Sequence, residues 1–116
     1  MSKKTTEELD IAIDLIGALK DKANKPRWDL LDLNLIAKVV DVYTYGAHKK
    51  YEPDSWQGVP KEDIYAALMR HITAWQSGEK INKTDGDLYH MAQVIWNALA
   101  LLHHDIEENE NEDNRY

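Results

Sequence analysis

Residues 65–102 read YAALMRHITAWQSGEKINKTDGDLYHMAQVIWNALALL, and this stretch decides the fold. Two runs of apolar residues at helical spacing flank a polar connection that holds Gly78 and Gly86. The first run includes Ile64, Leu68 and Trp75, and the second includes Leu88, Met91, Ile95, Ala98, Leu99 and Leu102. The pattern predicts one helix from Pro60 to Gly78 and an antiparallel helix that ends near Ile106.

Two further helices are predicted on the N-terminal side. The first runs from about Thr6 to Ala23, opened by a capping-box pattern and ended by Pro26. The second runs from about Asp32 to Lys50, and its apolar side carries Leu35, Ile36, Val39, Val40 and Tyr43. Gly46 inside it costs about 1 kcal/mol relative to alanine, which indicates close approach by a backbone or a ligand. No strand is predicted, so the fold class is all-α: a small antiparallel bundle of about four helices.

The size of the chain indicates one domain. With 116 residues and 43% hydrophobic content, residues 1–106 are expected to form a single helical domain. Residues 107–116 are mostly acidic or amide residues and are predicted to be a disordered tail. Four helices in so short a domain leave large apolar faces, so a homo-oligomer is expected.

Charge and composition limit the partners. The net charge of -7 argues against duplex nucleic acid, whose binding depends on cation–phosphate contacts. The absence of cysteine excludes disulfides and thiolate metal sites. No apolar run approaches the roughly 20 residues of a membrane span, and the first residues do not resemble a signal peptide. A cytoplasmic protein without a membrane partner is expected.

Cations and flat aromatic rings are nevertheless concentrated in a few segments of this acidic chain. Lysine and arginine can hold phosphate oxygens, and a tryptophan can stack on a base. Each short cluster is weak evidence alone, because lysines near a helix end also interact favourably with the helix dipole. Together they predict a nucleotide-binding site made of Lys25, Arg27, Lys50, Tyr51, Trp56 and Arg70.

Polar residues interrupt the two helices of the deciding stretch. His71 lies on an apolar arc, where a histidine is either a satisfied core residue or a functional group. His90, Gln93 and Asn97 recur at helical spacing and form either a solvated rim or the wall of a pocket. If the helices face each other, His71 or Arg70 converges with this stripe. The connection between them supplies Glu79 and Asp85, beside Asp87, as the best candidates for metal ligands.

Several segments resemble one known family. KPRWDLL at 25–31, TYGAHKKYEPDSW at 44–56, YAALMRHITAWQSGEKI at 65–81 and HMAQVIWNALALL at 90–102 are similar to the phage-associated dATP/dGTP diphosphohydrolase N-terminal domain. The likeness covers about residues 25–102. The chain departs from the expected motifs at Ser55, where an asparagine is usual, at Asn82 and Thr84, where acids are usual, and at Gln93, where a second histidine is usual.

The resemblance implies a metal-dependent pyrophosphohydrolase that converts dATP or dGTP to the monophosphate and pyrophosphate, in a phage setting and hence in a host cytoplasm. In that interpretation Glu79 and Asp85 hold Mg²⁺, and His71 and His90 orient phosphate or transfer protons. The nucleotide-binding set is completed by Asn97. Because the phosphate-binding cations are retained better than the metal and proton-transfer groups, a protein that only sequesters a nucleotide, such as a host immune signal, is the alternative. A helical interaction module is a second alternative.

Overall fold

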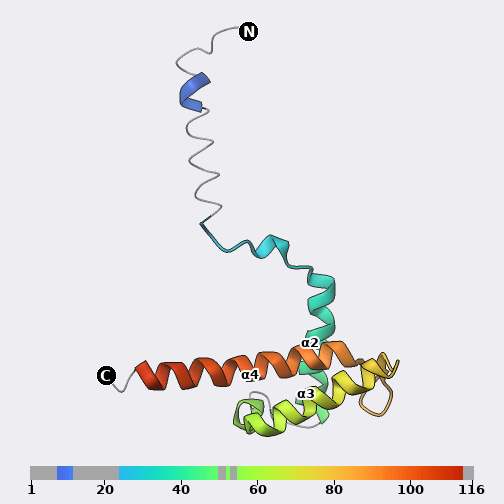
Figure 1. The fold of residues 1–116 in the computed structure, drawn as a ribbon. Helices are drawn as coiled ribbons and strands as arrows, with labels where there is room; N and C mark the ends of the chain where they lie inside the picture. Colours follow the sequence, from blue (N-terminus) through green and yellow to red (C-terminus); the bar gives the residue numbers. More distant parts are fainter. Residues whose placement is uncertain (1–7, 12–23, 50–51, 53–54, 114–116) are drawn as a thin grey trace. The chain divides into compact units, whose positions relative to one another are not determined.

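The computed structural model describes residues 8–11, 24–49, 52 and 55–113, and the chain divides into two units, residues 1–32 and 33–116. In the first unit, residues 8–11 are helical and Trp28–Leu30 form the short 3₁₀ helix η1 (Figure 1). The predicted helix from Thr6 to Ala23 is therefore tested only at residues 8–11, because its other positions lie outside the described residues.

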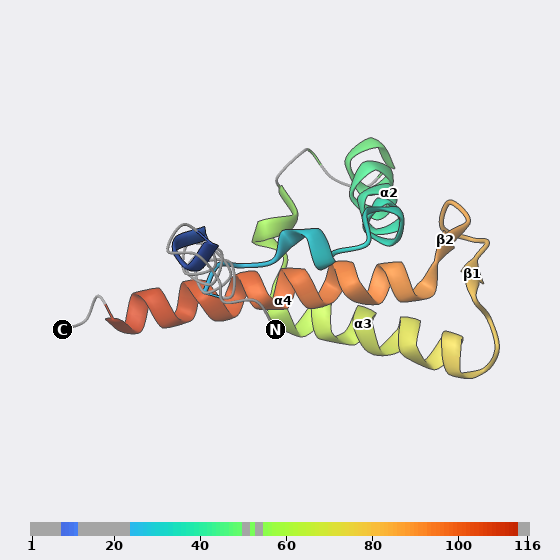
Figure 2. The same cartoon turned by 90° about the horizontal axis from the view of Figure 1, so that it is seen from above.

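The second unit contains the long helices of the described chain. These are α2 (Leu33–Lys49), α3 (Lys61–Gln76) and α4 (His90–Asp113), and the 3₁₀ helix η2 (Ser55–Gly58) precedes α3. Helices α3 and α4 run antiparallel side by side, and α2 lies across the first half of α4 (Figures 1 and 2). The all-α prediction is confirmed. None of the described helices is long and apolar enough to cross a membrane.

Helix α4 corrects one prediction from the sequence. It continues to Asp113, so residues 107–113 are helical where a disordered acidic tail was expected from Glu107 onward. Glutamate is a good helix former, and two of these residues have cationic or imidazole neighbours. The Lys61 ammonium lies 2.7 Å from Glu108, and the His103 ring lies 3.3 Å from Glu107 one turn away. The helix propensity of glutamate and these contacts outweigh the tendency of an acidic segment to be disordered.

A single residue determines where each end of α3 lies. The carbonyl of Pro60, the residue before the helix, accepts hydrogen bonds from the N–H groups of Asp63 and Ile64. At the other end, Gly78 has a φ of 104°, which an L side chain rarely adopts. Its N–H bonds the Trp75 carbonyl, and the next N–H, of Glu79, bonds the Ala74 carbonyl, so the helix ends in a Schellman motif. This turn directs the chain back towards α4.

A small hairpin that the sequence did not predict joins α3 to α4. Strand β1 (Ile81–Asn82) pairs antiparallel with β2 (Leu88–Tyr89), with Ile81 opposite Tyr89. In the intervening turn, Gly86 has a φ of 73°, and a Cβ there would lie 2.5 Å from Cε2 of Tyr45 on α2. The N–H of His90 donates to the Lys80 carbonyl, which carries the pairing into α4. Two-residue strands leave no periodicity for a sequence pattern to show.

The core lies where α2, the hairpin and α4 meet. Val42, Leu88 and Ala92 form a buried cluster, against which the half-buried rings of Tyr45 and Trp96 pack. On α2 the buried residues are Val39 and Val42, whereas the predicted apolar positions Leu35 and Val40 are 68% and 52% exposed. Because α2 crosses α4, only a short part of its apolar side is covered.

Candidate functional site

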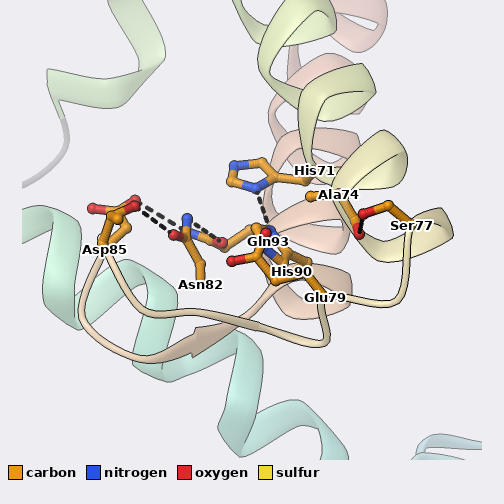
Figure 3. A network of polar contacts seen from close by, with 9 residues as sticks. His71, Ala74, Ser77, Glu79, Asn82, Asp85, His90 and Gln93 are labelled. Carbon is orange, nitrogen blue, oxygen red and sulfur yellow. Dashed lines mark hydrogen bonds and ion pairs between the residues drawn. The ribbon is translucent and has the colours of Figure 1, made fainter.

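The polar stripe on α4 is buried. His90, Gln93 and Asn97 are each 4% exposed, so the stripe faces the interior of the unit and is not a solvated rim. Burying polar groups is costly unless they find hydrogen-bond partners. The partners come from α3 and from the hairpin, and they tie the stripe into one network (Figure 3).

Two histidines meet at the α3 end of this network. The Nδ1 atoms of His71 and His90 lie 3.0 Å apart, at hydrogen-bond distance (Figure 3). On the other side of the His90 ring, Nε2 lies 3.5 Å from Oε2 of Glu79, the residue placed by the Schellman turn. This second contact is electrostatic, because Nε2 has no hydrogen-bond partner. The sequence predicted that His71 would converge with the α4 stripe, and the structure brings His71 into contact with His90 of that stripe.

The arrangement favours one tautomer for each of His71 and His90. A contact between two Nδ1 atoms needs one N–H and one lone pair. If His71 donates, the proton of a neutral His90 lies on Nε2, where it faces the Glu79 carboxylate. If His90 donates, a neutral His90 instead turns a lone pair towards that carboxylate, which is unfavourable. Glu79 therefore favours His71 as the donor, which places the remaining lone pair of a neutral His71 on its Nε2.

The hairpin end of the network is built from amides. Gln93 Oε1 accepts a hydrogen bond from Asn82 Nδ2 at 3.3 Å, and Gln93 Nε2 donates to Asp85 Oδ2 at 3.1 Å. Thr84 donates to Asn82 Oδ1 at 2.8 Å, and Asn97 Nδ2 donates to the Gln93 carbonyl at 2.7 Å. Three of these residues, Asn82, Thr84 and Gln93, are positions at which the chain departs from the expected motifs. They form one hydrogen-bonded group.

A cavity of about 100 Å³ lies between α2, α3, α4 and the hairpin. Its apolar wall includes Val42, Leu88 and Trp96, and Gly46 on α2 also borders it. The glycine inside the second predicted helix thus lies at the cavity, as its unfavourable propensity indicated. The polar wall consists of His71, Asp85, Gln93 and Asn97.

A comparison with known protein families identifies the family of the chain. The family described as dATP/dGTP diphosphohydrolase, N-terminal, matches residues 17–115, which is most of the chain. The chain belongs to this family. The resemblance found from the motifs is confirmed, and the match extends beyond them at both ends. No curated protein and no solved structure matches the chain.

Of the cations predicted for the site, Arg70 is the one described in the second unit, and it is not among the described residues that line the cavity. Arg70 is exposed on α3, one position from His71. Lys25 and Arg27 belong to the first unit, where Arg27 makes two 2.7 Å hydrogen bonds to Asp29. This pairing lowers the pKa of Asp29 and raises that of Arg27. Lys50 and Tyr51 lie outside the described residues.

The tryptophan predicted to hold the base has a different position. Trp56 on η2 packs edge-on in an aromatic cluster, 5.9 Å from Tyr43, 5.9 Å from Trp96 and 5.5 Å from His103 between ring centroids. Burial in this region raises the pKa of Tyr43. Trp96, not Trp56, borders the cavity, together with Tyr45. Neither ring was predicted from the sequence as part of the site, although Trp96 stands between Gln93 and Asn97.

The two predicted metal ligands are separated. Glu79 contacts His90 and Asp85 contacts Gln93, so they lie on opposite sides of the network (Figure 3). Among the described residues, no three His, Asp or Glu side chains are grouped to hold a metal ion. Mg²⁺ is often bound by one or two carboxylates together with substrate phosphates. Asp85, at the cavity wall, fits such a single-carboxylate role better than Glu79 does.

Proposed function

We propose that this chain binds a purine deoxynucleotide at the cavity and hydrolyses the triphosphate to the monophosphate and pyrophosphate. The observation that carries the proposal is the burial of His90, Gln93 and Asn97, of which Gln93 and Asn97 border the cavity together with His71 and Asp85. Buried polar groups that converge on a cavity are typical of a binding or catalytic site. Membership of the family described as dATP/dGTP diphosphohydrolase, N-terminal, supports a purine deoxynucleotide as the substrate.

The cavity accommodates only part of a nucleotide. Its volume of about 100 Å³ is below the roughly 300 Å³ at which ordinary small-molecule sites begin. None of its described lining residues is lysine or arginine, so its lining offers no cation to pair with a phosphate group. The base therefore enters the cavity, where Trp96 offers an aromatic surface and Gln93 and Asn97 offer amide groups. The phosphates remain outside.

The cations predicted from the sequence then have a consistent role. Arg70 is exposed on α3 and precedes His71 in the sequence, and it is proposed to meet the phosphates outside the cavity. From the sequence alone, Lys25, Arg27, Lys50 and Tyr51 are proposed as phosphate-binding residues. Charged hydrogen bonds of this kind are roughly twice as strong as neutral ones. Trp56 packs edge-on against Trp96.

Hydrolysis requires a water molecule to bond to phosphorus while the bridging P–O bond breaks and a proton leaves the water. His71 can take this proton on Nε2, because His90 accepts from its Nδ1 and Glu79 orients His90. Mg²⁺, with Asp85 as its single carboxylate ligand from the cavity wall, would neutralise charge on the phosphates when bound. The chain's own part is to hold the base, position the histidines and accept the proton.

A second function is favoured by one specific observation. The amide network of Asn82, Thr84 and Gln93 engages Asp85 with neutral groups, where metal and proton-transfer residues were expected. A protein that only holds a nucleotide, such as a host immune signal sequestered by a phage, needs no more than these donors. A helical interaction module, the second alternative from the sequence, is favoured by the acidic end of α4.

A nucleotide panel separates these functions. Purified protein is incubated with dATP, dGTP and other nucleotides in the presence of Mg²⁺, and chromatography measures both products and retained ligand. Hydrolysis that stops with EDTA supports the enzyme. Asp85→Asn should then reduce turnover far more than ligand retention. Asp105→Asn, which changes an exposed carboxylate on α4 away from the cavity, should leave both unchanged.

The other outcomes are equally informative. Clean recovery of bound, intact dATP and dGTP with Mg²⁺ or Mn²⁺ present rejects hydrolysis and favours sequestration. If EDTA and Glu79→Gln leave affinity intact, the protein's own donors hold the ligand. If no nucleotide is retained or hydrolysed, both nucleotide functions are wrong.

A further inference from the structure

An apolar stripe runs along the side of α4 that faces away from the buried polar residues. It consists of Ile95, Leu99, Leu102 and Ile106, which are 44%, 40%, 51% and 49% exposed. Their spacings of four, three and four residues place them within a narrow arc of the helix, at the 3.5-residue repeat of a coiled-coil seam. Four large apolar side chains in one continuous exposed line favour a partner.

The order of the residues identifies that partner. The stripe reads Ile-Leu-Leu-Ile with spacings four-three-four, so it is the same in both directions along the helix. A two-fold axis between Leu99 and Leu102 would place Ile95 of one copy against Ile106 of the other, and Leu99 against Leu102. Contacts of this self-complementary kind define a two-fold interface between identical chains. We propose that this stripe is the seam of an antiparallel homodimer formed through α4.

The charge along α4 favours the antiparallel orientation. The helix extends beyond the Lys61–Glu108 ion pair at the start of α3, and its last residues are rich in glutamate (Figure 2). In the antiparallel dimer this acidic end lies towards the first turn of α4 and the hairpin of the second copy. That region carries the exposed Lys80 and Lys83 and the positive end of the helix dipole beside Glu79, Asp85 and Asp87, so it is far less acidic than the end of α4. A parallel dimer would instead place two acidic ends together.

The absence of cysteine allows a direct test of the register. Ile95→Cys and Ile106→Cys chains are prepared separately, then mixed and oxidised. In the proposed dimer, residue 95 lies opposite residue 106, whereas the two copies of residue 95 are eleven positions apart along the axis, about 16 Å. A disulfide needs Cα atoms within about 7 Å. Only the mixture should cross-link efficiently. Cross-linking of either variant with itself, but not in the mixture, would overturn the proposal.

Sedimentation measures the association itself. The wild-type chain should sediment as a dimer at micromolar concentration, and Leu99→Glu should raise the dimer dissociation constant by about 100-fold or more, because each copy would bury a charge in the seam. Val40→Glu, on the exposed side of α2, is the matched control and should leave the dimer intact. Circular dichroism checks that both variants fold.

A charge-swapped pair distinguishes the orientations. Leu99→Lys combined with Leu102→Glu places opposite charges against each other in the antiparallel dimer and like charges together in a parallel one. The double variant should recover association relative to Leu99→Lys alone. A wild-type monomer of 13.4 kDa, or a dimer unaffected by Leu99→Glu, would show that the stripe is not a dimer seam and would overturn the proposal.

Discussion

Replacement of Gly86 by alanine should destabilise the protein strongly, for two separable reasons. At a φ of 73° an alanine occupies the left-handed region, which costs about 1–2 kcal/mol for a residue with a Cβ. Its Cβ would also lie 2.5 Å and 2.6 Å from two carbons of the Tyr45 ring. Overpacking of this kind costs about 1–3 kcal/mol. The sum, about 2–5 kcal/mol, is a large share of the free energy of unfolding of a small domain.

Two other glycines provide matched controls. Gly78 has a φ of 104°, but a Cβ there meets nothing within 4 Å, so Gly78→Ala should lose only the backbone part, about 1–2 kcal/mol. A Cβ at Gly58 also has open space, and Gly58→Ala should change the free energy of unfolding by no more than about 0.5 kcal/mol. Urea unfolding followed by circular dichroism gives each value by linear extrapolation. Equal losses for Gly86→Ala and Gly78→Ala would refute the contact with Tyr45 as the larger cause.

Three further predictions concern the site and the long helix. Arg70→Ala should weaken nucleotide binding by about 2 kcal/mol in calorimetry. Because Arg70 is exposed, the melting temperature of the protein should stay nearly unchanged. A fall in melting temperature without a binding defect would contradict the phosphate role. Asn97→Ala should cost about 1 kcal/mol of unfolding free energy through its lost hydrogen bond to the Gln93 carbonyl, as urea unfolding would measure, and should also weaken binding. Lys61 lowers the pKa of Glu108, so the pair stabilises the fold above the ordinary carboxyl pKa of 4.5 and loses this effect as pH falls through the lowered value. The melting temperatures of wild type and Glu108→Gln should therefore converge in acid. A difference in melting temperature that stays constant with pH would rule out the ion pair as the cause of that difference.

The parts of the fold that depend on local chemistry could be predicted from the sequence. Pro60 and Gly78 define the ends of α3, because each restricts or releases the backbone at its own position. The hairpin could not be predicted, because its strands are two residues long and depend on pairing between β1 and β2. The sequence also could not predict that Val42 is buried and Val40 exposed, because this depends on the angle at which α2 meets α4.

The same division applies to the candidate site. The polar stripe of α4 was visible because His90, Gln93 and Asn97 share one helix face, and its burial removes the alternative of a solvated rim. Glu79 and Asp85 are close in sequence, which suggested a shared metal ion. The Schellman turn and the hairpin direct them to different neighbours, and neither turn shows in the spacing of the two acids.

The position of Trp96 at the cavity wall gives the protein a built-in optical probe. Trp28 and Trp75 are 79% and 47% exposed, so a soluble quencher such as acrylamide reaches them readily. Trp56 and Trp96 are half-buried and lie 5.9 Å apart, and only Trp96 of the pair borders the cavity. The emission that survives quenching therefore comes mainly from this pair. Its change on titration with a nucleotide reports occupancy of the cavity without any added label.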